Sequence, residues 1–235
     1  MATFRSEILG NDLLISGLRA RGFVLSEFDS GDENRCSFMR LGHADIHVVL
    51  LISIWDDGSF RCALIISSMF VSKVFHRCGL FLDLSNFPTE NRPEGVLTVE
   101  LLWLKWNDNP EIAQSDDKYS LKGQDGVRRL LEDLDTLGQA FISSVATPQQ
   151  LADFLLKLDE YPARIKWGGK PGSADPFIFA AILYIEAGEK VKARAALARG
   201  LREYDFPEPR LHWQTCRQND FKKRRELLLT EIGAE

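Results

Sequence analysis

The chain has 235 residues, of which 45% are hydrophobic and 27% are charged, and its formal net charge is −5. This composition is typical of a folded globular protein and gives no reason to expect a long disordered region. The acidic balance argues against a general binder of phosphate backbones, which needs clustered Lys and Arg, so nucleic acid is disfavoured as a partner.

The charge is distributed unevenly along the chain. Residues 1–150 carry 14 basic and 21 acidic side chains, whereas residues 151–235 carry 15 and 13. This asymmetry gives the N-terminal half an acidic field that can steer a basic partner, and a merely solvated surface is the simpler alternative.

Neither the cysteines nor the apolar runs indicate secretion or membrane insertion. The four cysteines form no CxxC pair, and the N-terminal residues MATFRSEILGND lack the apolar stretch of a signal peptide. The longest nearly uncharged run, Val48 to Trp55, is far shorter than the ~20 residues of a membrane span. We therefore expect a cytoplasmic protein with reduced thiols and no transmembrane helix.

The N-terminal half predicts a helix followed by an antiparallel sheet. Apolar residues between Phe4 and Arg21 have helical spacing, and Gly22 directly after them is a stop signal. Asp57-Gly58 is a favoured hairpin turn between a β-branched apolar run and an alternating one. Strands are predicted over residues 23–28, 36–41, 47–55 and 60–67.

Two segments after this hairpin complete the predicted sheet region. Residues 69–78 change to helical spacing and favour a short helix, with a strand as the alternative. Alternating apolar residues predict a buried strand over residues 97–106, which the turn residues at 107–110 end.

The C-terminal half predicts five successive helices. An apolar stripe of period 3.6 runs from Val127 to Val145, and Asp133 is expected on its opposite, outward side. A capping box at residues 147–150 and a start signal at Asp175-Pro176 begin further helices, and Gly188 ends one of them. A last helix is predicted from about Asp220 to Ile232.

A glycine-rich segment, WGGKPGS at residues 167–173, has some features of a phosphate loop. Such a loop requires GxxxxGK followed by Ser or Thr, but here Pro171 follows Lys170. Proline has no amide hydrogen to donate, and Ser173 lies two residues late for the hydroxyl that holds magnesium. We therefore interpret the segment as a linker rich in turn residues.

The histidines and cysteines form a metal or nucleophile site only if separate segments converge. His43 and His47 are four residues apart, which on a strand is ~13 Å and too far for two ligands of one ion. His76 and Cys78 form an isolated HxC pattern. Buried core cysteines are the simpler interpretation, so we assign no metal ligand, catalytic residue or cofactor.

Three further groups of side chains have ordinary structural explanations. Paired aspartates in turns usually face water, and a basic cluster on a helix is usually a solvated face. Tryptophans anchor a partner only where they are exposed. These groups are Asp56-Asp57 with Asp116-Asp117, Lys222 to Arg225, and Trp103, Trp106, Trp167 and Trp213.

The order of elements resembles a known family more than any motif does. A helix ending in RGF, the hairpin VVLLISIWDDGSFRCALIISS, the segment LLWLKW and the run DGVRRLLEDLDTLGQAFISSVATPQQLADFLL occur in that order. Over about residues 4–158 this resembles a bacterial α+β family of unknown function, some of whose members are immunity proteins of toxin systems. The resemblance implies a small cytoplasmic protein and no established catalytic residues.

A second resemblance concerns the C-terminal helices. The segment AAILYIEAGEKVKARAALARGL, within residues 176–202, is similar to one helix pair of a tetratricopeptide-type repeat. A solenoid stacks three or more such units, and only one is recognisable here. The pair is therefore expected to pack on the rest of the protein.

Together these patterns predict an α+β fold in which an antiparallel sheet of about four to five strands packs on helices. We expect a domain at residues 1–160, a linker at 161–175 and a helical segment at 176–235. The preferred hypothesis is a non-enzymatic protein-binding module, immunity-like, whose acidic N-terminal surface binds a basic protein. Candidate contact residues are Asp29, Asp32, Glu33, Asp56, Asp57 and Trp106.

Two alternatives belong to other functional classes. A hydrolase or metal enzyme would require His43, His47, His76 and Cys78 to converge with acidic neighbours. A helical scaffold would require an open concave groove along residues 174–232.

Overall fold

The chain folds into two compact units that interleave along the sequence. The computed structural model describes residues 4–26, 33–42, 45–54, 58–80, 94–102, 104, 119–157, 176–205 and 212–233. The sheet unit comprises residues 1–67, 97–144 and 161–166, and the helical unit comprises residues 68–96, 145–160 and 167–235. The predicted linker at 161–175 lies outside the described residues.

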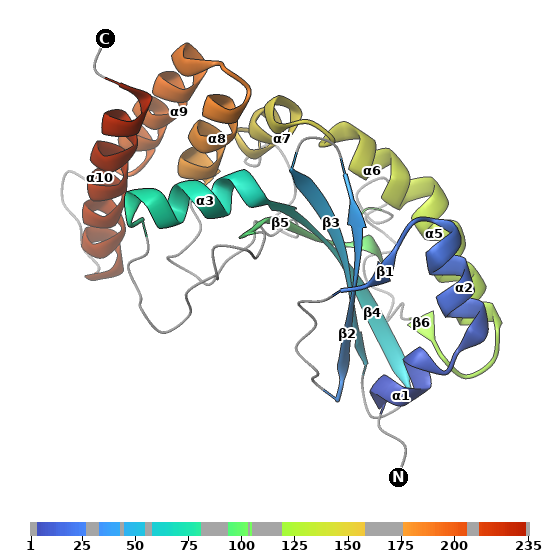
Figure 1. Ribbon diagram of the computed structural model, residues 1–235. Coiled ribbons are helices and arrows are strands. Elements are labelled where there is room, and N and C mark those ends of the chain that lie inside the picture. The colour runs from blue at the N-terminus through green and yellow to red at the C-terminus, as the bar shows by residue number, and fades with distance from the viewer. Residues whose placement is uncertain are drawn as a thin grey trace. The chain divides into compact units, whose positions relative to one another are not determined.

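The fold is of the α+β class, as the sequence predicted (Figure 1). The described strands are β1 Val24–Leu25, β2 Arg35–Leu41, β3 Ile46–Ile54, β4 Ser59–Ser68, β5 Glu94–Glu100 and β6 Tyr119–Ser120. They form one sheet in the order β1-β2-β3-β4-β5, and β6 pairs with β4 outside this path. The pairs β1–β2, β2–β3 and β4–β6 are antiparallel. Strand β1 therefore lies at one end of the strand order.

Strand β3 lies in the middle of the sheet because it carries apolar residues on both of its faces. Buried and half-buried side chains alternate along its whole length. Its register with β2 places Leu50 opposite Phe38 and Ile52 opposite Cys36, and all four side chains are buried. A shift of one residue would move every one of these side chains to the other face, so the core fixes the register.

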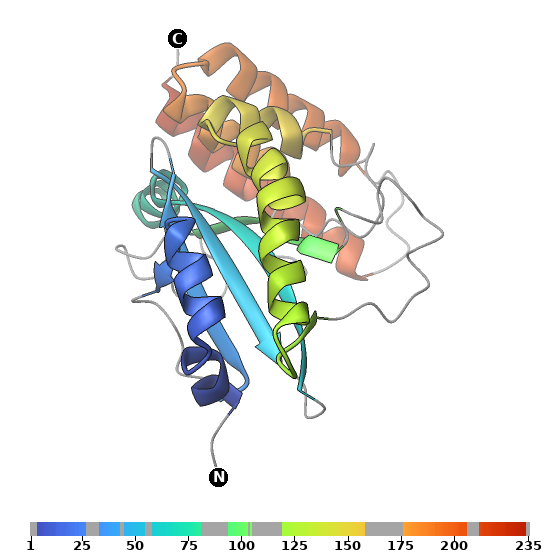
Figure 2. The same ribbon diagram turned by 90° about the vertical axis from the view of Figure 1, so that its right-hand side faces the viewer.

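Helices α2 and α5–α6 cover one face of this sheet, where they lie side by side (Figure 2). The helices of the sheet unit are α1 Phe4–Leu9, α2 Asp12–Ala20, α5 Asp125–Asp133 and α6 Gln139–Ser144, and the π-helical turn η3, Leu134–Gly138, joins the last two. Gly17 allows close contact, because a Cβ atom there would lie 2.4 Å from Cδ1 of Leu131. Arg21 Nε, at the C-terminal end of α2, donates to Asp135 Oδ1 of η3 at 2.7 Å.

The helical unit is built around one buried helix. Its helices are α3 Met69–Cys78, α7 Pro148–Leu155, α8 Pro176–Glu186, α9 Lys190–Glu203 and α10 His212–Ile232. Every side chain from Phe177 to Tyr184 in α8 is buried, and α8 contacts α3, α7, α9 and α10. A helix that is apolar on all sides must be covered on all sides, which explains this central position.

The predicted start and stop signals occur where the sequence places them. Thr147 and Gln150 form both hydrogen bonds of a capping box in front of α7. Gly188 ends α8 with a φ of 76°, a left-handed conformation that glycine adopts without steric cost. Ser68 caps α3 by accepting from the Val71 amide at 3.2 Å, so residues 69–78 form the predicted helix and not the alternative strand.

Several predicted boundaries are wrong. The first helix is interrupted at Gly10, because Asn11 accepts from the Leu14 amide and starts α2 anew. The strand predicted over residues 97–106 ends at Glu100, and residues 101 and 102 are helical. The last helix begins at His212, eight residues before the predicted Asp220. The prediction missed these residues because the first turns of the helix are polar and lack an apolar period.

One side chain expected on the surface is buried. Asp133 has only 8% of its surface exposed, although the helical period predicted an outward position. The hydroxyl of Tyr119 donates to its Oδ2 at 2.9 Å and compensates the buried carboxylate. Tyr119 belongs to β6, which the sequence did not predict.

No helix within the described residues is long and apolar enough to span a membrane.

Candidate functional site: an apolar pocket beside the first strand

The end of α2 determines the path of the chain into the pocket. Gly22 adopts a φ of 77°, and its amide donates to the Arg19 carbonyl at 2.9 Å. The Phe23 amide donates to the Leu18 carbonyl at 3.0 Å, which completes a Schellman motif. The chain therefore reverses sharply, and Phe23 packs back under α2 while the next residues extend as β1.

Strand β1 carries apolar side chains on both faces, and both are open. Val24 is 55% exposed and Leu25 is 45% exposed. Successive side chains of a strand point to opposite faces, so each face of β1 carries one partly exposed apolar side chain. The two exposed apolar residues are adjacent to each other at the end of the sheet, where a strand can pair with a further chain.

The hydrogen-bond pattern shows which main-chain groups of β1 face outward. The Ser26 amide donates to the Ser37 carbonyl at 2.8 Å, and the register of β1 with β2 places Leu25 opposite Phe38. Bonded and non-bonded pairs alternate in an antiparallel ladder. The N–H and C=O of Leu25 therefore point away from β2, to the side on which no other strand of the described residues lies.

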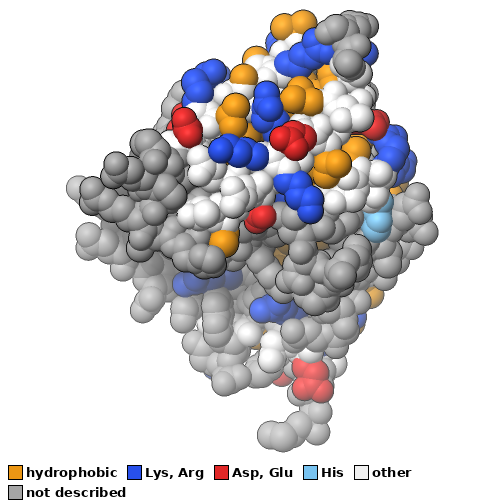
Figure 3. All heavy atoms as spheres, turned by 90° about the vertical axis from the view of Figure 1, so that its left-hand side faces the viewer, with side chains coloured by type: hydrophobic (Ala, Val, Ile, Leu, Met, Phe, Trp, Pro, Cys, Tyr) orange, Lys and Arg blue, Asp and Glu red, His pale blue; other side chains and the backbone are white. Residues whose placement is uncertain are grey.

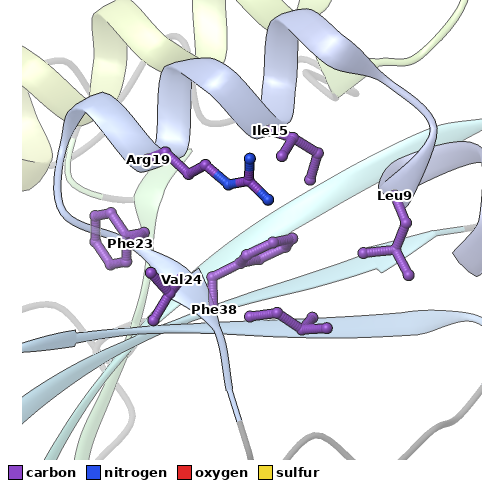
Figure 4. A pocket seen from close by; sticks show the side chains of 7 residues that line it. Leu9, Ile15, Arg19, Phe23, Val24 and Phe38 are labelled. Carbon is purple, nitrogen blue, oxygen red and sulfur yellow. The ribbon is translucent and has the colours of Figure 1, made fainter.

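A pocket of about 210 Å³ lies between α2 and this end of the sheet (Figure 4). It is lined by six apolar side chains and one cation: Leu9, Ile15, Phe23, Val24, Leu25, Phe38 and Arg19. Phe23 and Phe38 are almost fully buried and form its rigid base, whereas Leu9, Val24 and Leu25 are exposed at its rim. The pocket thus joins the exposed side chains of β1 to the core of the sheet unit.

Arg19 is the polar group of this pocket. Figure 4 shows its side chain reaching from α2 across the space in front of the Phe38 ring, toward Ile15. The residue is exposed, and within the described part of the chain its guanidinium makes no hydrogen bond or ion pair. Its place in the last turn of α2 also suits the helix dipole, which favours cations there.

A second arginine holds the pocket wall in place. The Arg40 guanidinium lies 5.2 Å from the centre of the Phe23 ring, a cation–π contact. Its Nη1 also donates to Gln139 Oε1 at 3.0 Å. Phe23, which is buried at the base of the pocket, is therefore also held by a contact from β2.

Most of the predicted contact residues cannot be placed. Asp29, Asp32, Asp56, Asp57 and Trp106 lie outside the described residues, as do Trp103 and Trp167, while the Trp213 side chain is likewise not described. Glu33 is described: it is exposed in the turn before β2, and its carbonyl accepts from the Arg5 amide at 2.9 Å.

The histidines and cysteines do not form a metal centre in the described part of the chain. No group of three or more His, Cys, Asp or Glu there could hold a metal ion. His76 and Cys78 both lie on α3, two residues and thus about 200° apart around the helix. His43 lies outside the described residues.

His47 is a separate, structural feature of β3. Both of its ring nitrogens are buried and lack a hydrogen-bond partner among the described residues. Burial lowers the pKa of the imidazole, and the negative charge of Asp45 partly opposes this effect. His47 is therefore an uncompensated polar group in the sheet, with consequences for stability that are testable.

The helical unit presents a mixed surface. On the face shown in Figure 3, Lys and Arg side chains are interspersed with hydrophobic and acidic ones and are not gathered into one patch. Within the predicted basic cluster, Lys222 and Lys223 are exposed but Arg224 is buried. The tetratricopeptide-like pair α8–α9 is closely packed, and its inner helix α8 is covered along its length, so the described residues of α8 line no open groove.

Sequence patterns did not identify this pocket. The RGF segment marked the end of a helix, but periodicity cannot show that Val24 and Leu25 remain exposed or that Arg19 points over a cavity. No protein-family model, curated protein or solved structure matches this chain. The resemblance to the bacterial immunity-associated family stays a prediction.

Proposed function

We propose that this protein is a non-enzymatic protein-binding module that holds an extended segment of its partner at β1. The observation that carries this proposal is the apolar pocket beside an exposed strand at the end of the sheet. A partner strand would pair with the outward N–H and C=O of Leu25 and place one side chain in the pocket.

The size of the pocket suits an amino-acid side chain. Pockets for drug-sized molecules occupy ~300–1,000 Å³, whereas a cavity of ~150 Å³ accommodates a benzene ring. At about 210 Å³, this pocket has room for one aromatic or branched aliphatic side chain. Burial of such a side chain contributes about 1.5–3 kcal/mol, the usual size of an anchoring contact.

The chemistry of the lining favours binding over catalysis. Of the seven lining residues that the structure describes, six are apolar and the seventh, Arg19, carries a guanidinium. Such a group orients a negatively charged ligand through its hydrogen-bond donors. The described lining residues therefore include no nucleophile and no carboxyl or imidazole group that could act as a general acid or base.

The acidic charge of the N-terminal half supports a basic partner. Residues 1–150 carry seven more acidic than basic side chains. Such a field accelerates association with a positively charged protein and is screened by salt. The association rate is accordingly expected to fall as NaCl is raised from 50 to 500 mM, and a rate independent of salt would remove this electrostatic part of the proposal.

The binding proposal is tested with a library of random synthetic heptapeptides that have free termini. Peptides retained by the full-length protein are identified by mass spectrometry and measured against two variants, Leu25→Gln in the pocket rim and Val191→Gln on α9. Val191 is 81% exposed and belongs to the helical unit, which makes it a matched control. The proposal expects Leu25→Gln to weaken the retained peptides about tenfold and Val191→Gln to leave them unchanged.

Two results would contradict the proposal. One is a library from which no peptide is retained, and the other is a set of retained peptides that bind the two variants equally well. Either outcome would leave the pocket as a packing irregularity at the end of the sheet.

A further inference from the structure

The position of Arg19 specifies the ligand of this pocket more closely. Resting on the proposed function, we infer that the pocket binds the C-terminal residue of its partner chain, with an apolar side chain in the cavity and the terminal carboxylate on Arg19. The occupant is thus a free chain end and not an internal segment.

The first step is that the pocket offers a cation to its ligand. The arginine guanidinium carries five N–H donors in a planar fork that matches an anion such as a carboxylate. Arg19 makes no hydrogen bond or ion pair within the described residues, yet its side chain reaches over the cavity toward Ile15 (Figure 4). The guanidinium is therefore available to any ligand that occupies the cavity.

The second step is that the anion is a carboxylate. A carboxylate carries one negative charge and accepts two parallel hydrogen bonds from a single guanidinium. Phosphate groups carry a charge of about −1.5 to −2 and are recognised in proteins by clusters of arginines. Among the lining residues that the structure describes, Arg19 is the only cation, which matches the charge of one carboxylate.

The third step is that the carboxylate belongs to a chain end. Within a strand, neighbouring side chains point to opposite faces, so an internal acidic residue and its apolar neighbour would not enter the pocket together. A C-terminal residue carries an apolar side chain and a carboxylate on the same Cα atom. One residue can therefore satisfy both the cavity and Arg19.

The length of β1 supports the same occupant. The strand has two residues, and only Leu25 directs its main-chain groups away from β2. An internal segment that enters and leaves the site would gain few main-chain hydrogen bonds at such a short edge. A chain end needs fewer of them, because the carboxylate supplies a charge-assisted contact.

The test compares the retained heptapeptides in two chemical forms, the free acid and the C-terminal amide. Dissociation constants are measured with the wild-type protein, Arg19→Gln and, as a control, Lys122→Gln, which removes an exposed cation elsewhere in the sheet unit. We expect the acid to bind wild type and Lys122→Gln at least about tenfold more tightly than the amide, the usual effect of a charge-assisted hydrogen bond. In Arg19→Gln this preference should fall to about one.

A conservative variant separates charge from geometry. Arg19→Lys keeps the positive charge but lacks the planar fork that binds a carboxylate through two hydrogen bonds. It should retain part of the preference for the acid. Because Arg19 is exposed and makes no hydrogen bond or ion pair within the described residues, none of these variants is expected to alter the fold, and thermal unfolding checks this.

The outcomes distinguish this inference from the function on which it rests. If peptides bind in a manner that depends on Leu25 but acid and amide bind equally, the protein-binding proposal stands and the chain-end inference is wrong. The same conclusion follows if Arg19→Gln weakens only peptides with internal Asp or Glu. If no retained peptide depends on Leu25, both proposals fail.

Discussion

The hydroxyl of Tyr119 donates a hydrogen bond of 2.9 Å to the buried carboxylate of Asp133. This bond joins the short strand β6 to helix α5 at a place where both side chains are buried. Above the same ring, the Arg129 guanidinium lies 5.4 Å from the ring centre. The Tyr119 side chain is thus held inside the sheet unit by two residues of α5: its hydroxyl by Asp133 and its ring by Arg129.

Replacing Tyr119 with Phe should destabilise the sheet unit. The change preserves the ring and removes one donor from Asp133, and a buried acceptor that loses its donor costs about 1–3 kcal/mol. Urea unfolding followed by fluorescence measures this loss. Tyr184→Phe is the matched control, because Tyr184 donates to the half-buried Asp153 in the helical unit, where water can replace the lost bond. An equal effect of the two changes would argue against the special role of the buried pair.

Alkaline pH should destabilise the protein through buried acidic protons. Burial raises the pKa of both Tyr119 and the Cys62 thiol, with nearby negative charges as a further cause. The folded state then keeps protons that the unfolded chain loses above about pH 8.5 for Cys and pH 10 for Tyr. Because the unfolded state binds fewer protons, the free energy of unfolding falls with rising pH, by about 1.4 kcal/mol per unit for each group.

The Tyr119→Phe variant provides an internal check on this effect. It lacks the Tyr119 proton, so its free energy of unfolding should fall less steeply than that of wild type above about pH 10. The gap between the two proteins should therefore narrow as the pH is raised from 10 to 11. If the free energies of unfolding of the two proteins, measured by urea titration, fell in parallel with rising pH, the Tyr119 proton would not contribute to the loss of stability.

Acidic pH should act through His47. Its lowered pKa means that the folded protein binds this proton less readily than the unfolded chain, whose imidazole titrates near pH 6.5. The contribution of His47 to the free energy of unfolding is fully present above that pH and is lost as the pH falls below it. His47→Phe removes the titration and the two unpaired ring nitrogens, so this variant should be more stable than wild type at pH 5, by more than at pH 8.

Val49→Phe is the control for the histidine prediction. Val49 lies two residues further along β3 on the same half-buried face and does not titrate. Its effect on the free energy of unfolding should be the same at pH 5 and pH 8. A pH-dependent effect at this position as large as that of His47→Phe would assign the acid sensitivity to other groups.

Local signals in the sequence predicted the fold well where the responsible interactions are themselves local. The capping box at Thr147, the stops at Gly22 and Gly188 and the alternation of β3 depend on residues within a few positions of one another. β6 and the burial of Asp133 depend on a contact between segments 14 residues apart. No periodic pattern records such a contact, so the sequence placed Asp133 on the wrong side of its helix.

The candidate site was missed for a related reason. Each of its residues has an ordinary role in the sequence: Arg19 in the last turn of a helix, Phe23 after a glycine stop, Val24 and Leu25 in a strand. What makes them a site is the end position of β1 in the sheet and the packing of α2 over it. Both are properties of the tertiary fold that a local pattern does not record. The acidic loop residues were easier to recognise in the sequence but did not indicate this pocket.

The last prediction concerns the close packing of the helical unit at Gly200. A Cβ atom there would lie 2.8 Å from Cβ of Phe177 and 2.4 Å from Cζ of Phe221. Gly200→Ala should gain about 1 kcal/mol of helix propensity but lose about 1–3 kcal/mol to overpacking, because the Phe177 Cβ is attached directly to the α8 backbone and cannot rotate away. We expect a net loss of stability in urea unfolding.

Gly17→Ala in the sheet unit is the informative comparison. The atoms nearest to the Cβ atom there would be those at the side-chain end of Leu131, whose methyl groups can move by a rotamer change. The gain in helix propensity is the same, so Gly17→Ala should cost less than Gly200→Ala or even stabilise the protein. If Gly200→Ala proved the more stable of the two, α8 and α9 would have to pack less closely in solution than these distances require.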